Sequence, residues 1–141
     1  MGKTVIIGDV KTLDQILSAD VLSTIGIHTH DFKVLDWLQL SSDQKSACIR
    51  YGVKYVSLTE YEVEETIRMF QQDCTHSVGL TQYGALVFAK NNDALFASCD
   101  QLTLEMGKRI GLIRFRITES QSSLLPMFEV YGIDNQITVA I

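Results

Sequence analysis

The stretch from Leu80 to Asp100, LTQYGALVFAKNNDALFASCD, decides how the chain is expected to fold. Residues 80–90 are apolar nearly all round, which is typical of a helix in the centre of a domain. Residues 94–97 then form a short apolar strand, and Asp100 follows soon after it. A buried helix beside a buried strand indicates an α/β domain with a mostly parallel central sheet.

Apolar runs and capping signals extend this pattern to the rest of the chain. Helix-opening capping boxes are expected at three pairs, Thr12 with Gln15, Ser41 with Gln44, and Thr59 with Glu62. Further strands are expected at residues 4–8, 53–58 and 113–117, with a short extended piece at 26–29. A helix is expected around residues 32–38, another over 100–110, and a last one from Thr118 that Pro126 kinks or ends. The tail, 133–141, is either a strand or a docking arm.

Two of the expected helices have apolar residues at spacings that predict their buried faces. The inward residues are expected to be Val63, Ile67 and Phe70 in the first and Leu102, Met106 and Ile110 in the second. The acids of the first, Glu60, Glu62, Glu64 and Glu65, are expected to form an exposed acidic first turn.

Length and composition predict a single cytoplasmic domain over residues 1–141. The chain of 141 residues has 46% hydrophobic residues, enough for one core, and no apolar run long enough to span a membrane. Its three cysteines, Cys48, Cys74 and Cys99, are scattered and lack zinc-site spacing, so free thiols in a reducing compartment are expected. The net charge of −5 excludes a general attraction to nucleic acid.

Two acids follow apolar strands and are the first candidates for chemistry. Asp9 follows Val5-Ile6-Ile7-Gly8, and Asp100 follows the strand at 94–97. If these strands are neighbours, their backbones lie about 4.8 Å apart. Two carboxylates that close require a proton or a cation such as Mg²⁺ or Mn²⁺. The alternatives are structural, since Asp100 has the spacing of a helix N-cap with Thr103 and Asp9 has that of a turn residue.

The residues quoted above resemble the PIN-like domains, small Mg²⁺-dependent nucleases found as toxins of bacterial toxin–antitoxin pairs. The resemblance runs from Val5 to about Phe128 and is most specific in residues 79–90, 94–100 and 108–112. It implies a three-layer αβα fold with a central, mostly parallel twisted sheet. It also implies an endoribonuclease that uses Mg²⁺ or Mn²⁺, with RNA, an antitoxin-like protein and further copies of itself as partners.

The resemblance also assigns the metal site residue by residue. Asp9 matches the acid after the first strand, and Asp100 the acid after the fourth. Asp36 stands where a glutamate is usual, and Gln82 stands where an aspartate is expected. Asp9, Asp36 and Asp100 are therefore the predicted catalytic acids, and Gln82 is a predicted ligand through its carbonyl oxygen.

Basic residues near these acids suggest two further roles. After the first acid the family usually has a Thr and then an Asn or Ser, where this chain has Val10 and Lys11. The ammonium group of Lys11 is a candidate to neutralise Asp9 and Asp100 without a metal. Lys11, Lys108 and Arg109 are also the predicted contacts to RNA phosphates. The wider basic group is expected to include Arg114, Arg116 and Lys90. The alternative for Lys108 and Arg109 is a helix C-terminus, which favours cations.

Three histidines add weaker candidates. His28 and His30 alternate along an extended piece and would face one side, a possible metal pair without an evident third ligand. His76 precedes the central helix and is expected to be solvated. Two functions therefore remain open: a metal-dependent ribonuclease, or an inactive PIN-like module that acts through a partner.

Overall fold

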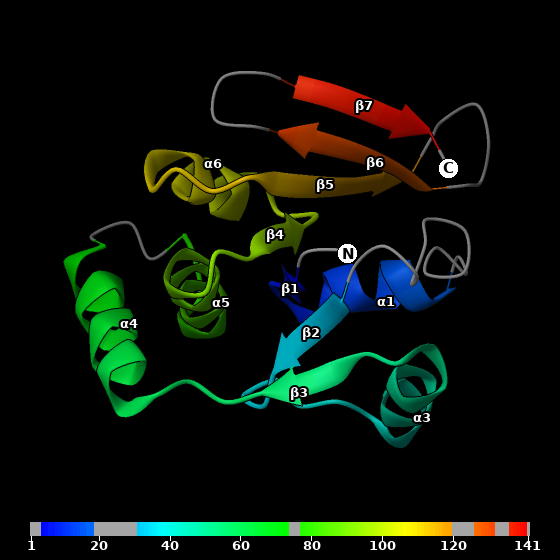
Figure 1. The fold of residues 1–141 in the computed structure, drawn as a ribbon, viewed down its shortest axis with the longest axis horizontal. Coiled ribbons are helices and arrows are strands. Elements are labelled where there is room, and N and C mark those ends of the chain that lie inside the picture. The colour runs from blue at the N-terminus through cyan, green and yellow to red at the C-terminus, as the bar shows by residue number, and fades with distance from the viewer. Residues whose placement is uncertain (1–3, 19–30, 74–76, 120–125, 132–135, 141) are drawn as a thin grey trace.

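The computed structural model describes residues 4–18, 31–73, 77–119, 126–131 and 136–140, with side chains as far as Arg114. Its spine is a sheet with the strand order β3-β2-β1-β4-β5-β6-β7 (Figure 1). The parallel strands are β1 (Thr4–Ile7), β2 (Asp31–Leu35), β3 (Lys54–Val56), β4 (Leu95–Ser98) and β5 (Arg114–Glu119). Two antiparallel strands extend the β5 edge, β6 (Pro126–Tyr131) and β7 (Gln136–Ala140).

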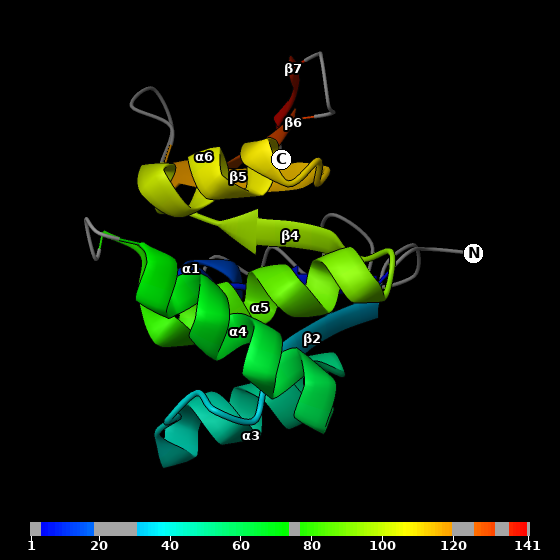
Figure 2. The same cartoon turned by 90° about the vertical axis from the view of Figure 1, so that its left-hand side faces the viewer.

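Helices cover both faces of the parallel strands, so the predicted three-layer αβα arrangement is confirmed. One face carries α1 (Val10–Ser18) and α3 (Ser42–Tyr51). The other carries α4 (Glu60–Gln72), α5 (Leu80–Asn91) and α6 (Gln101–Arg109), which lie together in Figure 2. Because successive strand residues point to opposite faces, Val5 and Ile7 pack under α1 while Ile6 packs under α5.

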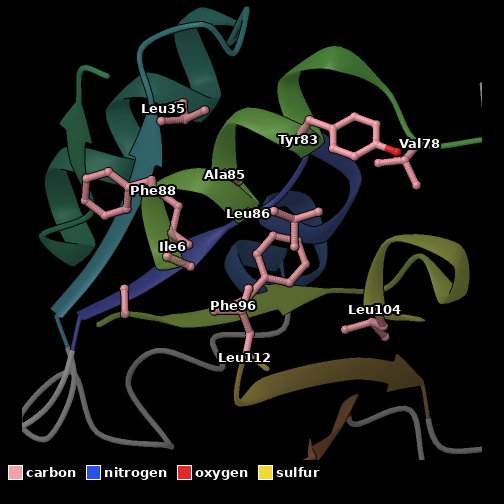
Figure 3. Close-up of a cluster of buried hydrophobic side chains, with 12 residues drawn as sticks. Ile6, Leu35, Val78, Tyr83, Ala85, Leu86, Phe88, Phe96, Leu104 and Leu112 are labelled. Atoms are coloured by element: carbon pink, nitrogen blue, oxygen red, sulfur yellow. The ribbon is translucent and has the colours of Figure 1, made fainter. Parts of the chain in front are cut away.

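The central helix predicted from residues 80–90 is α5, and it is buried from Tyr83 to Ala89. Its side chains meet Ile6 of β1 and Phe96 of β4 in the core shown in Figure 3. An all-round apolar helix is expected in this position, because the sheet covers one side of it and neighbouring helices cover others.

Two of the three predicted capping boxes are confirmed. The hydroxyl of Ser41 accepts from the backbone N–H of Gln44 at 3.2 Å, and the Gln44 side chain accepts from Ser41 N–H at 2.8 Å. Thr59 and Glu62 form the same reciprocal pair at the start of α4. Helix α3 ends at Gly52, whose φ of 73° is left-handed backbone that glycine adopts without strain.

Several predicted elements are wrong, and two segments predicted as helices, around Phe32 and from Thr118, are strands. The first helix begins at Val10 rather than Thr12, because Asp9 caps it. Phe32 lies in β2, where burial of both strand faces gives an apolar spacing that resembles a helix. Thr118 lies in β5, and Pro126 begins β6, a strand position that tolerates a missing N–H. The tail contains strand β7. The extended piece at 26–29 lies outside the described residues.

The predicted inward faces of α4 and α6 are also partly wrong. Glu62 and Glu65 of α4 are buried, whereas Ile67 is 41% exposed. The reason is a polar α4–α5 contact: Glu62 accepts from Asn92 Nδ2 at 3.2 Å, and Glu65 pairs with Lys90 at 3.2 Å. In α6 the buried residues are Thr103, Leu104 and Gly107, and Leu102 is 48% exposed.

A tight backbone approach at Gly8 generates the first prediction. A Cβ atom at Gly8 would lie 2.7 Å from Cζ of Phe96 and 3.3 Å from the carbonyl oxygen of Ala97. Since the Phe96 ring is fully buried, it has little room to move. We expect Gly8→Ala to lower the free energy of unfolding by about 1–3 kcal/mol, measured by urea denaturation.

The control is the same substitution in a Phe96→Leu background. The smaller side chain should relieve much of the crowding, so Gly8→Ala should cost less there. An equal cost in both backgrounds would show that the ring contact is not the cause.

Candidate functional site at the carboxyl edge of the sheet

The predicted acids stand at one edge of the sheet, after neighbouring strands. β1 pairs with both β2 and β4, with Ile7 opposite Val34 on one side and Ala97 on the other. Asp9, Asp36 and Asp100 follow the ends of these three strands by one or two residues. The strands before Asp9 and Asp100, β1 and β4, are neighbours, so the condition set in the sequence analysis is met. Adjacent strands have backbones about 4.8 Å apart.

Asp9 is half-buried, and both of its carboxylate oxygens accept hydrogen bonds. Oδ1 accepts from the backbone N–H of Thr12 at 2.7 Å, which caps the start of α1. Oδ2 accepts from Nε2 of Gln82 at 3.2 Å and from the hydroxyl of Ser98 at 3.4 Å. All of these donors are uncharged. The anion is thus stabilised by dipoles from α1, α5 and β4.

Gln82 is held in one orientation by a second contact. Its Oε1 accepts from the backbone N–H of Gly79 at 2.7 Å, at the start of α5. A backbone N–H can only donate, so Oε1 must face Gly79 and Nε2 must face Asp9. The carbonyl oxygen predicted to bind a metal is therefore engaged by the α5 cap instead.

Asp100 is the N-cap of α6, as the structural alternative predicted. Its Oδ2 accepts from the backbone N–H of Thr103 at 3.1 Å and makes a short hydrogen bond with the Thr103 hydroxyl. The backbone N–H of Asp100 donates to Oγ of Ser98 at 3.0 Å. Ser98 thereby links the Asp9 carboxylate to the start of α6.

Thr12 and Cys99 complete the connection between α1 and β4. The Thr12 hydroxyl accepts a hydrogen bond from the backbone N–H of Cys99 at 3.0 Å. The same hydroxyl donates to Sγ of Cys99 at 3.4 Å. Thr12 is fully buried, and Cys99 is a half-buried free thiol. Sequence reasoning missed Ser98 and Thr12 as members of this network. Their signal was that each is a small hydroxyl residue within three residues of a strand-end acid.

Asp36 makes a separate contact at the other side of β1. Its Oδ2 accepts from the Ser57 hydroxyl at 2.5 Å, and its backbone N–H donates to Val56 at 2.9 Å. The contact ties the ends of β2 and β3. Within the described residues, no hydrogen bond joins Asp36 to the network around Asp9.

The basic residues do not gather into one group. Lys11 is exposed and lines a hollow between α1 and α3, and among the described residues it pairs with neither Asp9 nor Asp100. Arg114 is buried and donates to the carbonyl of Leu104 at 3.0 Å, while Lys90 is paired with Glu65. Lys108 and Arg109 are exposed in the last turn of α6, which is the helix-end position of the structural alternative. The side chain of Arg116 and all three histidines lie outside what the structure describes.

The donor set at Asp9 does not fit a divalent cation as it stands. A cation needs oxygen ligands, and Oδ2 of Asp9 instead faces the N–H group of Gln82. Turning the amide to present its oxygen would break the bond to Gly79. In the described part of the chain, no group of three or more His, Cys, Asp or Glu residues is placed to hold a metal ion.

Comparison of the chain with protein-family models, with curated proteins and with solved structures finds no match. Among the helices that the structure describes, none combines the length and apolar character needed to cross a bilayer.

The cap at Asp100 generates the second prediction. Asp100→Ala should lower the free energy of unfolding by about 1 kcal/mol, because α6 loses its N-cap. Asp100→Asn should retain most of the stability, since asparagine caps a helix about as well. Chemical denaturation of the two variants measures the difference. An equal loss in both would mean that the negative charge, rather than the cap, is what position 100 provides.

Proposed function

We propose that this chain is a PIN-like domain without hydrolytic activity, which acts as an interaction module for a partner protein. The observation that carries the proposal is the hydrogen bond from Nε2 of Gln82 to Oδ2 of Asp9. Where the resemblance leads one to expect an aspartate and a metal ion, this chain has a neutral donor already in contact with the first acid.

The energetics of the edge support this proposal. An aspartate at position 82 would place a second carboxylate near Asp9, and the pair would need a proton or a cation. A glutamine instead donates to Asp9 and accepts from Gly79. All three acids at the edge also have structural partners: Thr12 for Asp9, Thr103 for Asp100 and Ser57 for Asp36. The edge can therefore hold the fold together without a bound ion.

The charge of the chain favours a protein partner over nucleic acid. At −5 the chain repels a polyanion, and the described residues show the basic side chains dispersed over different elements. We propose an antitoxin-like peptide or a second copy of the chain as the partner, in the cytoplasm. Free thiols at Cys48 and Cys99 are consistent with a reducing compartment.

A second candidate function is the Mg²⁺- or Mn²⁺-dependent endoribonuclease. It is favoured by the placement of Asp9, Asp36 and Asp100 after three adjacent parallel strands, because open parallel sheets bind ligands at this edge. Lys108 and Arg109 are exposed and would contact RNA phosphates in this candidate.

Metal binding separates the two candidates and gives the third prediction. Mn²⁺ should leave the melting temperature of the native chain unchanged, whereas it should stabilise Gln82→Asp, since a carboxylate then replaces the amide. A ligand that binds only the folded state at 100 times its Kd adds about 2.7 kcal/mol. Adding Lys11→Asn should increase the Mn²⁺ affinity of Gln82→Asp further, because it removes a positive charge. Thermal melts with and without Mn²⁺ measure both effects.

Gln71→Asp is the matched control, since Gln71 is an exposed glutamine on α4 and the substitution adds the same charge elsewhere. It should gain no Mn²⁺ dependence. Stabilisation of the native chain by Mn²⁺, together with RNA cleavage that Asp9→Asn abolishes, would reject the inactive module and support the ribonuclease.

A further inference from the structure

A hollow of about 260 Å³ lies between three helices on one face of the molecule, apart from the carboxyl-edge network. The helices are α4, α5 and α6, which Figure 2 shows side by side on that face. The hollow is lined by Met69, Gln72, Asp73, Tyr83, Met106 and Arg109. None of these residues belongs to the network around Asp9, so the hollow is a separate candidate site.

The inner wall is apolar and held in place. Met69 and Met106 are half-buried thioethers from α4 and α6. Between them Tyr83 is 1% exposed, and its hydroxyl donates to Oδ2 of Asp73 at 2.6 Å. Phe70 meets the Tyr83 ring edge-on, with centroids 6.2 Å apart. A ring held through its hydroxyl and by an aromatic neighbour makes a pre-formed wall, and pre-formed walls reduce the entropy cost of binding.

The Tyr83 hydroxyl stays a neutral donor in this setting. Burial, the hydrogen bond from Tyr83 to Asp73 and the negative charge of Asp73 together raise the pKa of Tyr83 to about 12, while the charge of Arg109 lowers it slightly. Arg109 lines the same hollow as Tyr83 and Asp73.

The rim carries one exposed cation. Arg109 is the last residue of α6, and among the described residues no carboxylate pairs with it. A guanidinium group presents a planar fork of donors that matches a carboxylate or a phosphate. The hollow therefore combines a thioether-rich wall with a guanidinium group on its rim, while the Asp73 carboxylate that also lines it accepts from the Tyr83 hydroxyl.

We propose that this hollow binds a small aromatic anion, with its ring against Met69 and Met106 and its carboxylate or phosphate on Arg109. Methionine sulfur makes favourable contacts with aromatic rings, which favours a ring over an alkyl chain. The volume lies just below the usual range for drug-sized ligands, so one ring or two fused rings fit better than a larger ligand. A nucleoside monophosphate and an aromatic carboxylic acid share this chemistry.

The test follows the methionine methyl groups by NMR, because the chain has only four methionines. The ¹³C-methyl-labelled native chain is titrated with adenosine monophosphate and with indole-3-acetate, and Met69→Leu and Met106→Leu assign the two signals. We expect saturable shifts of the Met69 and Met106 signals with at least one of the anions. A response to the first alone identifies a nucleotide as the ligand class, and a response to the second alone identifies an aromatic acid.

Two comparisons test the role of Arg109. Arg109→Gln should weaken binding about tenfold, as expected for a lost hydrogen bond to a charged group. Lys108→Gln is the matched control, since Lys108 is the adjacent exposed cation and does not line the hollow, and it should bind as the native chain does. Adenosine lacks the phosphate group. It should therefore bind the native chain about as weakly as adenosine monophosphate binds Arg109→Gln.

Three results would overturn the proposal: no shift with either anion at millimolar concentration, equal affinity for adenosine and its monophosphate, or equal losses in Arg109→Gln and Lys108→Gln. The outcome is independent of the Mn²⁺ experiment, because the hollow and the carboxyl edge share no residue. Circular dichroism of Arg109→Gln confirms that any loss of binding is not a loss of fold.

Discussion

The hydrogen bond between the Gln82 amide and the Asp9 carboxylate is the interaction on which the carboxyl edge depends. The amide of Gln82 is a neutral donor in contact with the Asp9 carboxylate, at an edge where the adjacent strand β4 leads to Asp100. Both carboxylate oxygens of Asp9 are thereby occupied by hydrogen bonds from uncharged donors, Thr12, Gln82 and Ser98.

The same carboxylate joins elements that are distant in sequence. Through Thr12 it holds the first turn of α1, through Gln82 the first turn of α5, and through Ser98 the end of β4. The hydroxyl of Ser98 then reaches the backbone of Asp100, where α6 begins. Such a network behaves as a unit, so removing one member affects the others more than a sum of pairs suggests.

Much of this architecture could be predicted from the sequence, because it follows from local patterns. The all-round apolar helix α5 and the reciprocal caps at Ser41 and Thr59 each leave such a pattern. The pairing of β1 with β4 does not, because it joins segments about ninety residues apart. The orientation of Gln82 does not, because an amide both donates and accepts. Only its position relative to Gly79, a backbone donor, decides which end faces Asp9.

The wrong predictions at Phe32 and in α4 have a common physical cause, since each concerns residues whose partners are remote in sequence. The spacing of apolar residues around Phe32 predicts a helix, because burial on both faces of a strand depends on neighbours that the local sequence does not show. Acids are usually solvated, so the sequence predicts that Glu62 and Glu65 are exposed. Their partners Asn92 and Lys90 are 30 and 25 residues away. Tertiary contacts thus overrode the local preference in both cases.

The buried acids of α4 also determine how that helix sits on α5. Apolar contacts tolerate small displacements, because one methyl group can replace another against the same surface. A carboxylate that is hydrogen-bonded to an amide or an ammonium group has no such freedom. If α4 slid by one turn, Glu62 and Glu65 would lose their donors, Asn92 and Lys90. These two acids therefore fix the register of α4 against α5, even where they add little to the free energy of unfolding.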